Sequence, residues 1–449
     1  MQENMNSRLG NTRIRITATR QPCIDGTVSP VIPHFFRRPL PAACLGAWIG
    51  LLAGTATADT LLGMEVSQAD ASGNQLIPFI NLSEYDNSNL FGLSNPQYAQ
   101  KLIGTTQTSD LVSNQTIGLD FDYAISGQSF SGHASYARSS YQTFSEFNNN
   151  TRDLGLQWNW AIGRLLSGDV GASDATHLTN LIYVQNTINI YTLQNAFAHA
   201  NVKLSPHWQI IGGATTGTIR NSSVSELVYN TDSTTASAGI KYVTDQGNSI
   251  SLVSKQSNGN YPDVVQTSPL ILSGYRQYDS GLEWSWLVSG RSRLLGSLYV
   301  TRMTPDSAAS LVQGYSGATG HLTYAWAPTG KLKVNLNVYR NINEYEGITS
   351  NYVVTNGVSL MPVWNITEKL AMNLGARSES LTFPPGSSYL YLTNATTHYR
   401  INTASFGIDY QMFRHTDLTL SLDRGSRVTN IPGLSYTWND ATLSLTQKF

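Results

Sequence analysis

Histidine, serine and carboxylate side chains are the groups in this chain that could do chemistry. Hydrolysis by a serine needs a histidine beside it and a third polar group that orients the imidazole. Sequence spacing ties none of the histidines to a nucleophile, and no close-spaced His/Asp/Glu set resembles a metal site. Glycine motifs for phosphates or dinucleotides are also absent from the sequence. The sequence therefore predicts a non-enzymatic protein without metal or cofactor. The histidines beyond residue 58 are His133, His177, His199, His207, His321, His398 and His415.

Polar and apolar residues alternate at a period of two along much of the chain. The pattern is clear in 117–124, 332–339, 405–411 and 418–423. A helix would place the charges of these segments among its apolar residues, so strands are predicted. Strands cross a membrane by closing into a barrel, with apolar side chains toward lipid and polar ones toward the lumen.

The same alternation selects a set of side chains that we expect to face the lumen. Both signs of charge occur in it, diluted by amides, whereas a single-sign ring would indicate ion selectivity. Such a wall suits a neutral or weakly charged polymer, or unselective diffusion. The alternative for each residue is that it only hydrates or braces the interior. The set consists of Asp120, Asp122, Lys241, Glu283, Lys333, Asn335, Asn337, Asn373, Arg377, Asp409 and Asp423.

Turn-like residues recur about every 40 positions, as expected for two strands of roughly ten residues with one tight turn and one longer loop. They lie at 126–127, 163–164, 205–206, 246–248, 289–291, 328–330, 365–367 and 414–415. With an opening strand near 76–85 and a closing strand at the carboxy terminus, eighteen strands are predicted, and sixteen is the alternative. The predicted fold is an all-β, antiparallel up-and-down transmembrane barrel with short periplasmic turns and longer extracellular loops.

Aromatic residues gather beside the predicted turns. Because Trp and Tyr prefer the membrane–water boundary, they predict a periplasmic girdle. A sugar-stacking ladder in the pore is the weaker alternative, since Trp158 and Trp160 share the parity of apolar neighbours. The girdle comprises Tyr123, Trp158, Trp160, Trp208, Tyr242, Trp286, Trp326, Trp364 and Tyr410.

Both ends of the chain indicate export and membrane assembly. Residues 1–58 read as a signal peptide with a long basic region, so that a later start codon is conceivable, and with cleavage between Ala58 and Asp59. Residues 59–75 would be a periplasmic segment and 76–449 the barrel. Cys23 and Cys44 both precede the cleavage site, so no disulfide is expected. The chain ends in Phe449, a carboxy-terminal aromatic residue of the kind that barrel assembly machinery reads.

Composition limits the partners. A formal net charge of −1 with 13% charged residues gives no indication of nucleic-acid binding. No apolar run reaches the roughly 18 residues that would predict a membrane helix. The expected location is the outer membrane of a Gram-negative bacterium, with outer-membrane lipid, lipopolysaccharide and the barrel assembly machinery as partners.

Several short segments carry a family resemblance that spans essentially the whole of 59–449. Residues 84–93 read EYDNSNLFGL, 156–160 read LQWNW, and 204–208 read LSPHW. They resemble the EpsL-type exopolysaccharide-associated outer-membrane β-barrels, a porin group encoded with exopolysaccharide biosynthesis genes. Gly92 stands where that group usually has an arginine. The resemblance implies a conduit or accessory for polysaccharide export that acts with periplasmic and inner-membrane export components.

Three functions follow as hypotheses. The first is exopolysaccharide export through the barrel, which the resemblance implies. The second is a general diffusion porin for small solutes. The third is a structural or surface-binding barrel whose lumen is plugged.

Overall fold

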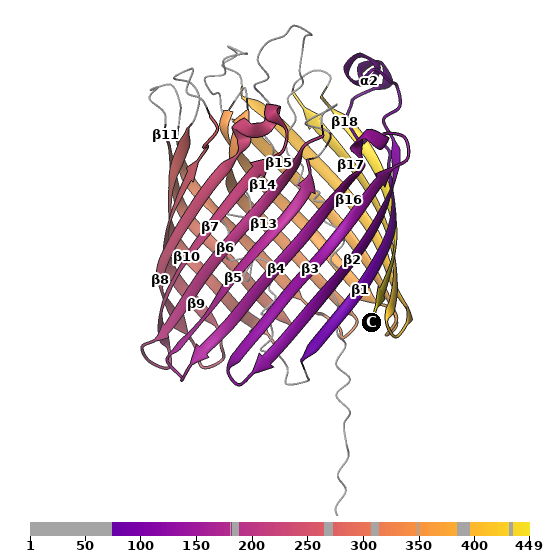
Figure 1. The fold of residues 1–449 in the computed structure, drawn as a ribbon. Helices are drawn as coiled ribbons and strands as arrows, with labels where there is room; N and C mark the ends of the chain where they lie inside the picture. Colours follow the sequence, from indigo (N-terminus) through magenta and orange to yellow (C-terminus); the bar gives the residue numbers. More distant parts are fainter. Residues whose placement is uncertain are drawn as a thin grey trace, which may run out of the picture.

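The computed structural model describes residues 74–179, 181, 188–264, 273–306, 314–347, 350–383, 396–430 and 434–449. Within these ranges the chain forms an 18-stranded antiparallel sheet that closes on itself (Figure 1). The strands are β1 (Gln75–Asn87), β2 (Asp110–Ile125), β3 (Gln128–Tyr141), β4 (Asn149–Ile162), β5 (Leu166–Leu178), β6 (Ile190–Lys203), β7 (Trp208–Asn221), β8 (Thr231–Val243), β9 (Ser249–Asn260), β10 (Gly274–Ser289), β11 (Ser292–Asp306), β12 (Tyr315–Trp326), β13 (Leu332–Gly347), β14 (Ser350–Asn365), β15 (Leu370–Phe383), β16 (Thr397–Phe413), β17 (Thr416–Thr429) and β18 (Tyr436–Lys448).

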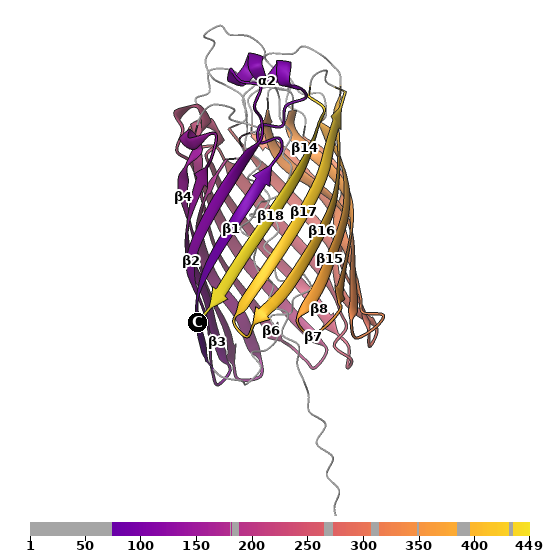
Figure 2. The same ribbon diagram turned by 90° about the vertical axis from the view of Figure 1, so that its right-hand side faces the viewer.

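Each strand pairs with its neighbours in the sequence, and β1 pairs with both β2 and β18. The register of β1 and β18 sets Phe79 opposite Lys448 and Asn87 opposite Asp440, so the seam is hydrogen-bonded along most of β1. Figure 2 shows β1 and β18 side by side, with the carboxy terminus at the end of the barrel where β1 begins. The prediction of an eighteen-stranded up-and-down barrel is confirmed, and the sixteen-stranded alternative is wrong.

All eight predicted tight turns connect consecutive strands at one end of the barrel. Three of them have backbone in the left-handed region, which glycine adopts most readily. The residues are Gly163 (φ 61°), Gly247 (φ 79°) and Ser126 (φ 56°), which precedes Gly127 in the first turn. Short turns of outer-membrane barrels are periplasmic, so this end is taken as the periplasmic one.

The opposite end carries the longer connections and the helices described. These are α2 (Pro96–Ile103), η1 (Ser145–Phe147) and η2 (Val224–Tyr229). Asn95 caps α2 by accepting a hydrogen bond from the Tyr98 backbone N–H at 2.8 Å. Strands extend further into this end than the sequence predicts: β9 continues to Asn260 and β15 to Phe383, although the sequence predicts extracellular loops at 256–273 and 380–397.

The outward face of the wall is apolar and exposed, as a lipid-facing surface requires. Val300 is 70% exposed and Leu252 62% exposed, although both belong to well-paired strands. Among the described residues no helix is long and apolar enough to span a membrane.

One hairpin leaves the cylindrical wall near the extracellular end. β12 and β13 pair only between Gly320–Arg340 and Trp326–Val334, while β13 and β14 stay paired far beyond. Closer to the extracellular end, β13 and β14 have side chains at positions that would face outward in a regular barrel. These side chains pack against inward-facing side chains of β10–β12. The hairpin therefore lies inside the upper wall of β10–β12. The cluster contains Tyr261, Tyr275, Met303, Tyr315, Tyr352 and Val354, with Ile342 packed against it.

The predicted signal peptide 1–58, its cleavage site at Ala58–Asp59 and nearly all of the 59–75 segment lie outside the described residues.

Candidate functional site

The inward face of the barrel is the candidate site, because it is the surface that a passing solute would contact. Each predicted lumen residue lies on the strand face opposite the exposed apolar side chains, for example Asp120 and Asp122 opposite Ile117 in β2, and Asn337 opposite Val338 in β13. Contact between these side chains and a passing solute stays a prediction.

Three adjacent strands, β9–β11, carry the first polar network. Lys255 Nζ lies 2.9 Å from Glu283 Oε1, and the Tyr299 hydroxyl donates to the same carboxylate. Next to them, the Thr301 hydroxyl donates to Asp279 at 2.5 Å, and Thr301 is fully buried. Lys255, Asp279 and Tyr299 were not predicted. The alternation of β9 could have found Lys255, because it shares the parity of Ser251 and Val253.

A second network links β13 and β15. Arg377 lies 2.5 Å from a Glu379 oxygen and donates to the Tyr339 hydroxyl at 3.3 Å, while Tyr339 also donates to Glu379. Glu379 is only 5% exposed, so its charge depends on this arginine. The sequence predicted Arg377 and missed Glu379, two positions further on the same face.

Predicted polar residues nearer the periplasmic turns have smaller networks. Asn373 donates to Asp409, which also accepts from Thr419 at 3.0 Å. Asn337 bridges Thr323 (2.8 Å) and Ser359 (3.1 Å). The remaining predicted residues are placed as follows: Lys241 lies opposite Gln209 and Ser251, Lys333 opposite Val363, Asn335 opposite Ala325 and Met361, and Asp423 accepts from Ser421 at 3.1 Å.

The structure brings one histidine beside both a carboxylate and a serine, which sequence spacing did not indicate. His133 Nδ1 lies 2.5 Å from Asp120 Oδ1, and its Nε2 lies 3.2 Å from Ser135 Oγ. Acyl transfer also needs N–H donors aimed at the developing oxyanion. Here the neighbouring backbone of β2, β3 and β4 is engaged in the sheet ladder. This trio is part of the polar inward face of the wall.

No group of three or more His, Cys, Asp or Glu side chains in the described ranges has the arrangement of a metal site.

The extracellular half of the inward face is closed in by side chains. Val353, Leu381 and Phe383 face inward and are at most 2% exposed, packed with Tyr399 and Ile401. Arg427 lies over the Tyr399 ring, with its guanidinium carbon 4.3 Å from the centroid. Sequence parity gave no indication of this packing, since a buried inward leucine breaks the polar-inside rule.

The periplasmic half of the same face is open. The Asp120 side chain is 50% exposed, Met361 is 44% exposed, and Asp122, Lys333 and Asn335 are exposed as well. The inward surface thus changes from an accessible polar wall to a filled region along the barrel axis.

Most predicted girdle residues lie on the outer surface near the short turns. Tyr123, Trp158, Trp208, Trp286, Trp326, Trp364 and Tyr410 are between 41% and 49% exposed. Trp160 and Tyr242 are half-buried, and the Trp160 ring covers Gly168 of β5. Their position at a membrane boundary stays a prediction, as does the assembly role of Phe449, whose backbone N–H donates to the Pro78 carbonyl at 2.9 Å.

Comparisons with known proteins found distant likeness only. No family model matches the chain, and no curated protein matches it. Similar solved structures include OccK9 (OpdG) of Pseudomonas aeruginosa, with 11% identity, 84% of this chain and 98% of that chain covered, and a TM-score of 0.47. OpdK of the same organism, solved with vanillate, has 10% identity, the same coverage and a TM-score of 0.45. OccAB3 of Acinetobacter baumannii has 8% identity, covers 84% and 99%, and has a TM-score of 0.44.

The EpsL-type resemblance has no support from these comparisons and stays a prediction. The closed wall of eighteen antiparallel strands, its exposed apolar outer face and its polar inner face are the features of the outer-membrane class of β-barrel. The chain is an outer-membrane β-barrel.

Proposed function

We propose that the protein is a passive, non-enzymatic channel for small polar solutes with little preference for charge. The observation that carries this proposal is the change along the inward face. Its periplasmic half is an accessible polar wall, and its extracellular half is packed with buried side chains. A narrowed region of this kind suits small molecules better than a polymer. The general diffusion porin is thus favoured over the exopolysaccharide conduit.

The charges of the wall support weak charge selectivity. Lys255 is paired with Glu283, and Arg377 with Glu379. Each of these two cations thus has an acidic neighbour, and opposite charges at this distance cancel most of the field that a passing ion would meet. Rings of one sign would be needed for strong selection.

Liposome swelling tests the size limit directly. Vesicles that contain the purified, refolded chain are diluted into isotonic solutions of uncharged sugars of increasing length. We expect rapid swelling with monosaccharides, and a rate that falls steeply over the next few sugar units. No swelling with any sugar would instead favour the plugged barrel, and equal rates with long oligosaccharides would favour a polymer conduit.

A further inference from the structure

Arginines surround the outer surface of the barrel near its extracellular end. Alternation places each of them on the outward face of its strand, as with Arg302, which shares the parity of the exposed Leu298 and Val300. We call this set the arginine belt. It consists of Arg138 (β3), Arg152 (β4), Arg220 (β7), Arg276 (β10), Arg302 (β11), Arg340 (β13), Arg400 (β16) and Arg424 (β17).

The belt lies at the extracellular edge of the lipid-facing surface. Its members are about nine to fourteen residues from the periplasmic turn of their strand. With a rise of roughly 3.4 Å per residue and a tilt of about 40°, that is about 25–35 Å above the turns. The apolar band of such barrels is about 25 Å tall, so the belt is level with the headgroups of the outer leaflet.

Half of the belt is engaged by neighbouring strands. Arg152 lies 2.7 Å from Asp174, and Arg220 is paired with Asp232. Arg276 Nε donates to Asn258 at 3.3 Å, and Arg340 donates to the Ala318 carbonyl at 3.1 Å and to Asn356 at 2.8 Å.

The other half has no partner within the protein. Arg138, Arg302, Arg400 and Arg424 make no hydrogen bond or ion pair with any residue of the described ranges. An unpaired guanidinium that faces lipid is costly within the band and is tolerated near its edge, where a headgroup can pair with it.

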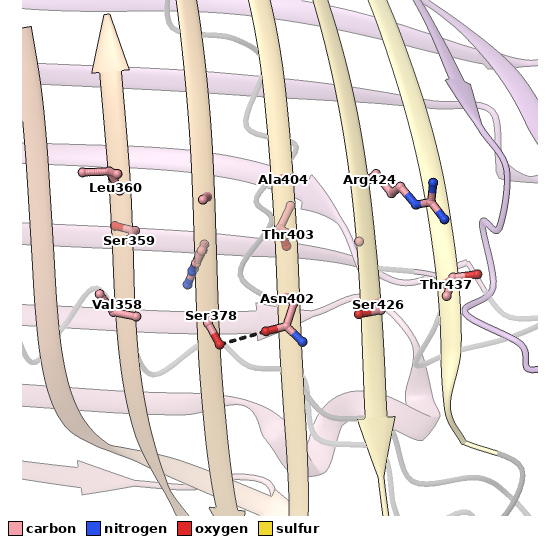
Figure 3. A pocket seen from close by; sticks show the side chains of 13 residues that line it. Val358, Ser359, Leu360, Ser378, Asn402, Thr403, Ala404, Arg424, Ser426 and Thr437 are labelled. Atoms are coloured by element: carbon pink, nitrogen blue, oxygen red, sulfur yellow. Dashed lines mark hydrogen bonds between the residues drawn. The ribbon is translucent and has the colours of Figure 1, made fainter.

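A groove of about 570 Å³ runs across the outer wall beside Arg424, over β14–β18. Val358 and Leu360 form one end of it, and Ala376 and Ala404 lie in its middle. Figure 3 shows the Arg424 side chain extending from β17 toward β18, and the Ser378 hydroxyl donating to Asn402 at 2.8 Å. The groove therefore combines apolar walls with one unpaired guanidinium at its edge.

We propose that this groove binds one molecule of a phosphorylated, multiply acylated glycolipid, the chemistry of the lipid A part of lipopolysaccharide. A phosphate would pair with Arg424, because the guanidinium fork matches phosphate oxygens in a bidentate manner. An acyl chain would lie along Val358 and Leu360. The proposal concerns the outer face and does not depend on what passes through the lumen.

A second copy of the chain could also cover such a groove, but the distribution of the belt favours lipid. An interface between copies would occupy one sector of the barrel. Arg400 and Arg424 lie on the adjacent strands β16 and β17, but Arg302 on β11 and Arg138 on β3 extend the unpaired set over more than half of the wall. Lipid headgroups surround the whole barrel, so lipid is the partner that can contact all four unpaired arginines.

Native mass spectrometry of the detergent-purified full chain tests the site. The probes are bis-phosphorylated lipid A, the same lipid after dephosphorylation, and phosphatidylglycerol. We expect the unmodified chain to retain one bis-phosphorylated lipid A, and Arg424→Gln to bind it at least tenfold more weakly. Arg138→Gln, the matched control on β3, four strands away from β17 and outside the groove, should stay within about twofold. Ala404→Leu, which fills the groove, should weaken binding without a change of charge.

Equal losses for Arg424→Gln and Arg138→Gln would overturn the site and leave diffuse attraction. Equal retention of the phosphorylated and dephosphorylated lipid would overturn the phosphate contact. A dimer without bound lipid would assign the groove to a second copy. Heat-modifiable migration on gels checks that each variant is folded. If Arg424→Gln fails to fold, Arg424→Lys serves instead and should bind more weakly than arginine, because it keeps the charge and loses the fork.

Discussion

Leu336 and Asn335 are neighbours in β13 whose side chains lie on opposite faces of the barrel wall. Leu336 is exposed on the outer face, and Asn335 is exposed on the inner face beside Met361. Exposure therefore has a different meaning at the two positions, because one side chain meets lipid and the other meets water.

Arginine substitutions at these two positions test the facing of the strand. Leu336→Arg lies near mid-height of the apolar band and should weaken insertion by roughly 2–4 kcal/mol. Asn335→Arg should be tolerated, since its charge stays in the lumen. Folded yield in lipid vesicles, followed as heat-modifiable migration over a urea series, measures both. Similar losses for the two variants would show that the assignment of faces is wrong.

Glu283 controls the charge balance of the inner wall. Its carboxylate neutralises Lys255 at 2.9 Å. Glu283→Gln should keep the hydrogen bond from Tyr299 and leave the Lys255 ammonium unbalanced, so the channel should turn toward anion selectivity. The reversal potential across a salt gradient measures this, with Asn335→Gln as a neutral control. An unchanged reversal potential would mean that Lys255 does not face the conducting path.

Glu226 is expected to make the stability of an extracellular loop depend on pH. It lies in η2 at 6% exposure, and Ser225 donates to its Oε1 at 3.2 Å. Burial raises the pKa of Glu226 from 4.5 to about 7, a shift that the Ser225 hydrogen bond opposes. Because the pKa is raised on folding, the protonated acid stabilises the loop at low pH, and that contribution is lost as the pH rises through about 7.

Hydrogen exchange of the 222–230 segment should therefore show weaker protection at pH 8 than at pH 5.5, after correction for intrinsic rates. Glu226→Gln, which cannot ionise, should keep the same protection at both values. A pH response that survives this substitution would exclude Glu226 as its source.

At the scale of elements, the hairpin of β13 and β14 is the part of the wall that departs from a regular barrel. The Tyr352 ring meets the Tyr315 ring edge-on, with centroids 5.7 Å apart, and its hydroxyl donates to the Gly314 carbonyl at 3.4 Å. These contacts hold the hairpin against the inner face of β12 where the β12–β13 ladder has ended.

Tyr352→Ala should loosen this hairpin. Removal of a buried aromatic ring typically costs about 3–5 kcal/mol, which exceeds what a single hairpin gains from its remaining contacts. We expect faster hydrogen exchange in β13 and β14 above Arg340, together with a noisier and higher conductance. Tyr278→Ala, which removes an exposed outer tyrosine, is the control and should change neither. Unaltered exchange in the hairpin would contradict its anchoring by Tyr352.

Strand number, turn positions and facing were predictable because they depend on local patterns. The alternation of polar and apolar residues along a strand determines which face of the wall a residue such as Asn337 occupies. A turn residue such as Gly163 has a left-handed backbone conformation that few residues other than glycine adopt. The hairpin was not predictable, because Tyr352 and Tyr315 meet through packing across two strands. The partner of Glu283 was not predictable either, because it depends on the register between β9 and β10.

At the scale of the whole molecule, the barrel presents three surfaces with different chemistry. The outer face is apolar below the arginine belt, the inner face is polar toward the periplasmic end, and buried side chains pack around Leu381 and Tyr352 toward the extracellular end. For the proposed channel they predict an accessible polar entrance on the periplasmic side and a narrower passage toward the extracellular side.

The most direct test is the single-channel conductance of the purified, refolded chain in a planar bilayer, with and without polysaccharide from the source organism. A narrow channel for small solutes predicts a steady, modest conductance of low ion selectivity that the polysaccharide does not block. A complete lack of conductance would contradict the channel, and a large conductance that the polymer blocks would contradict the size limit and favour a secretion conduit.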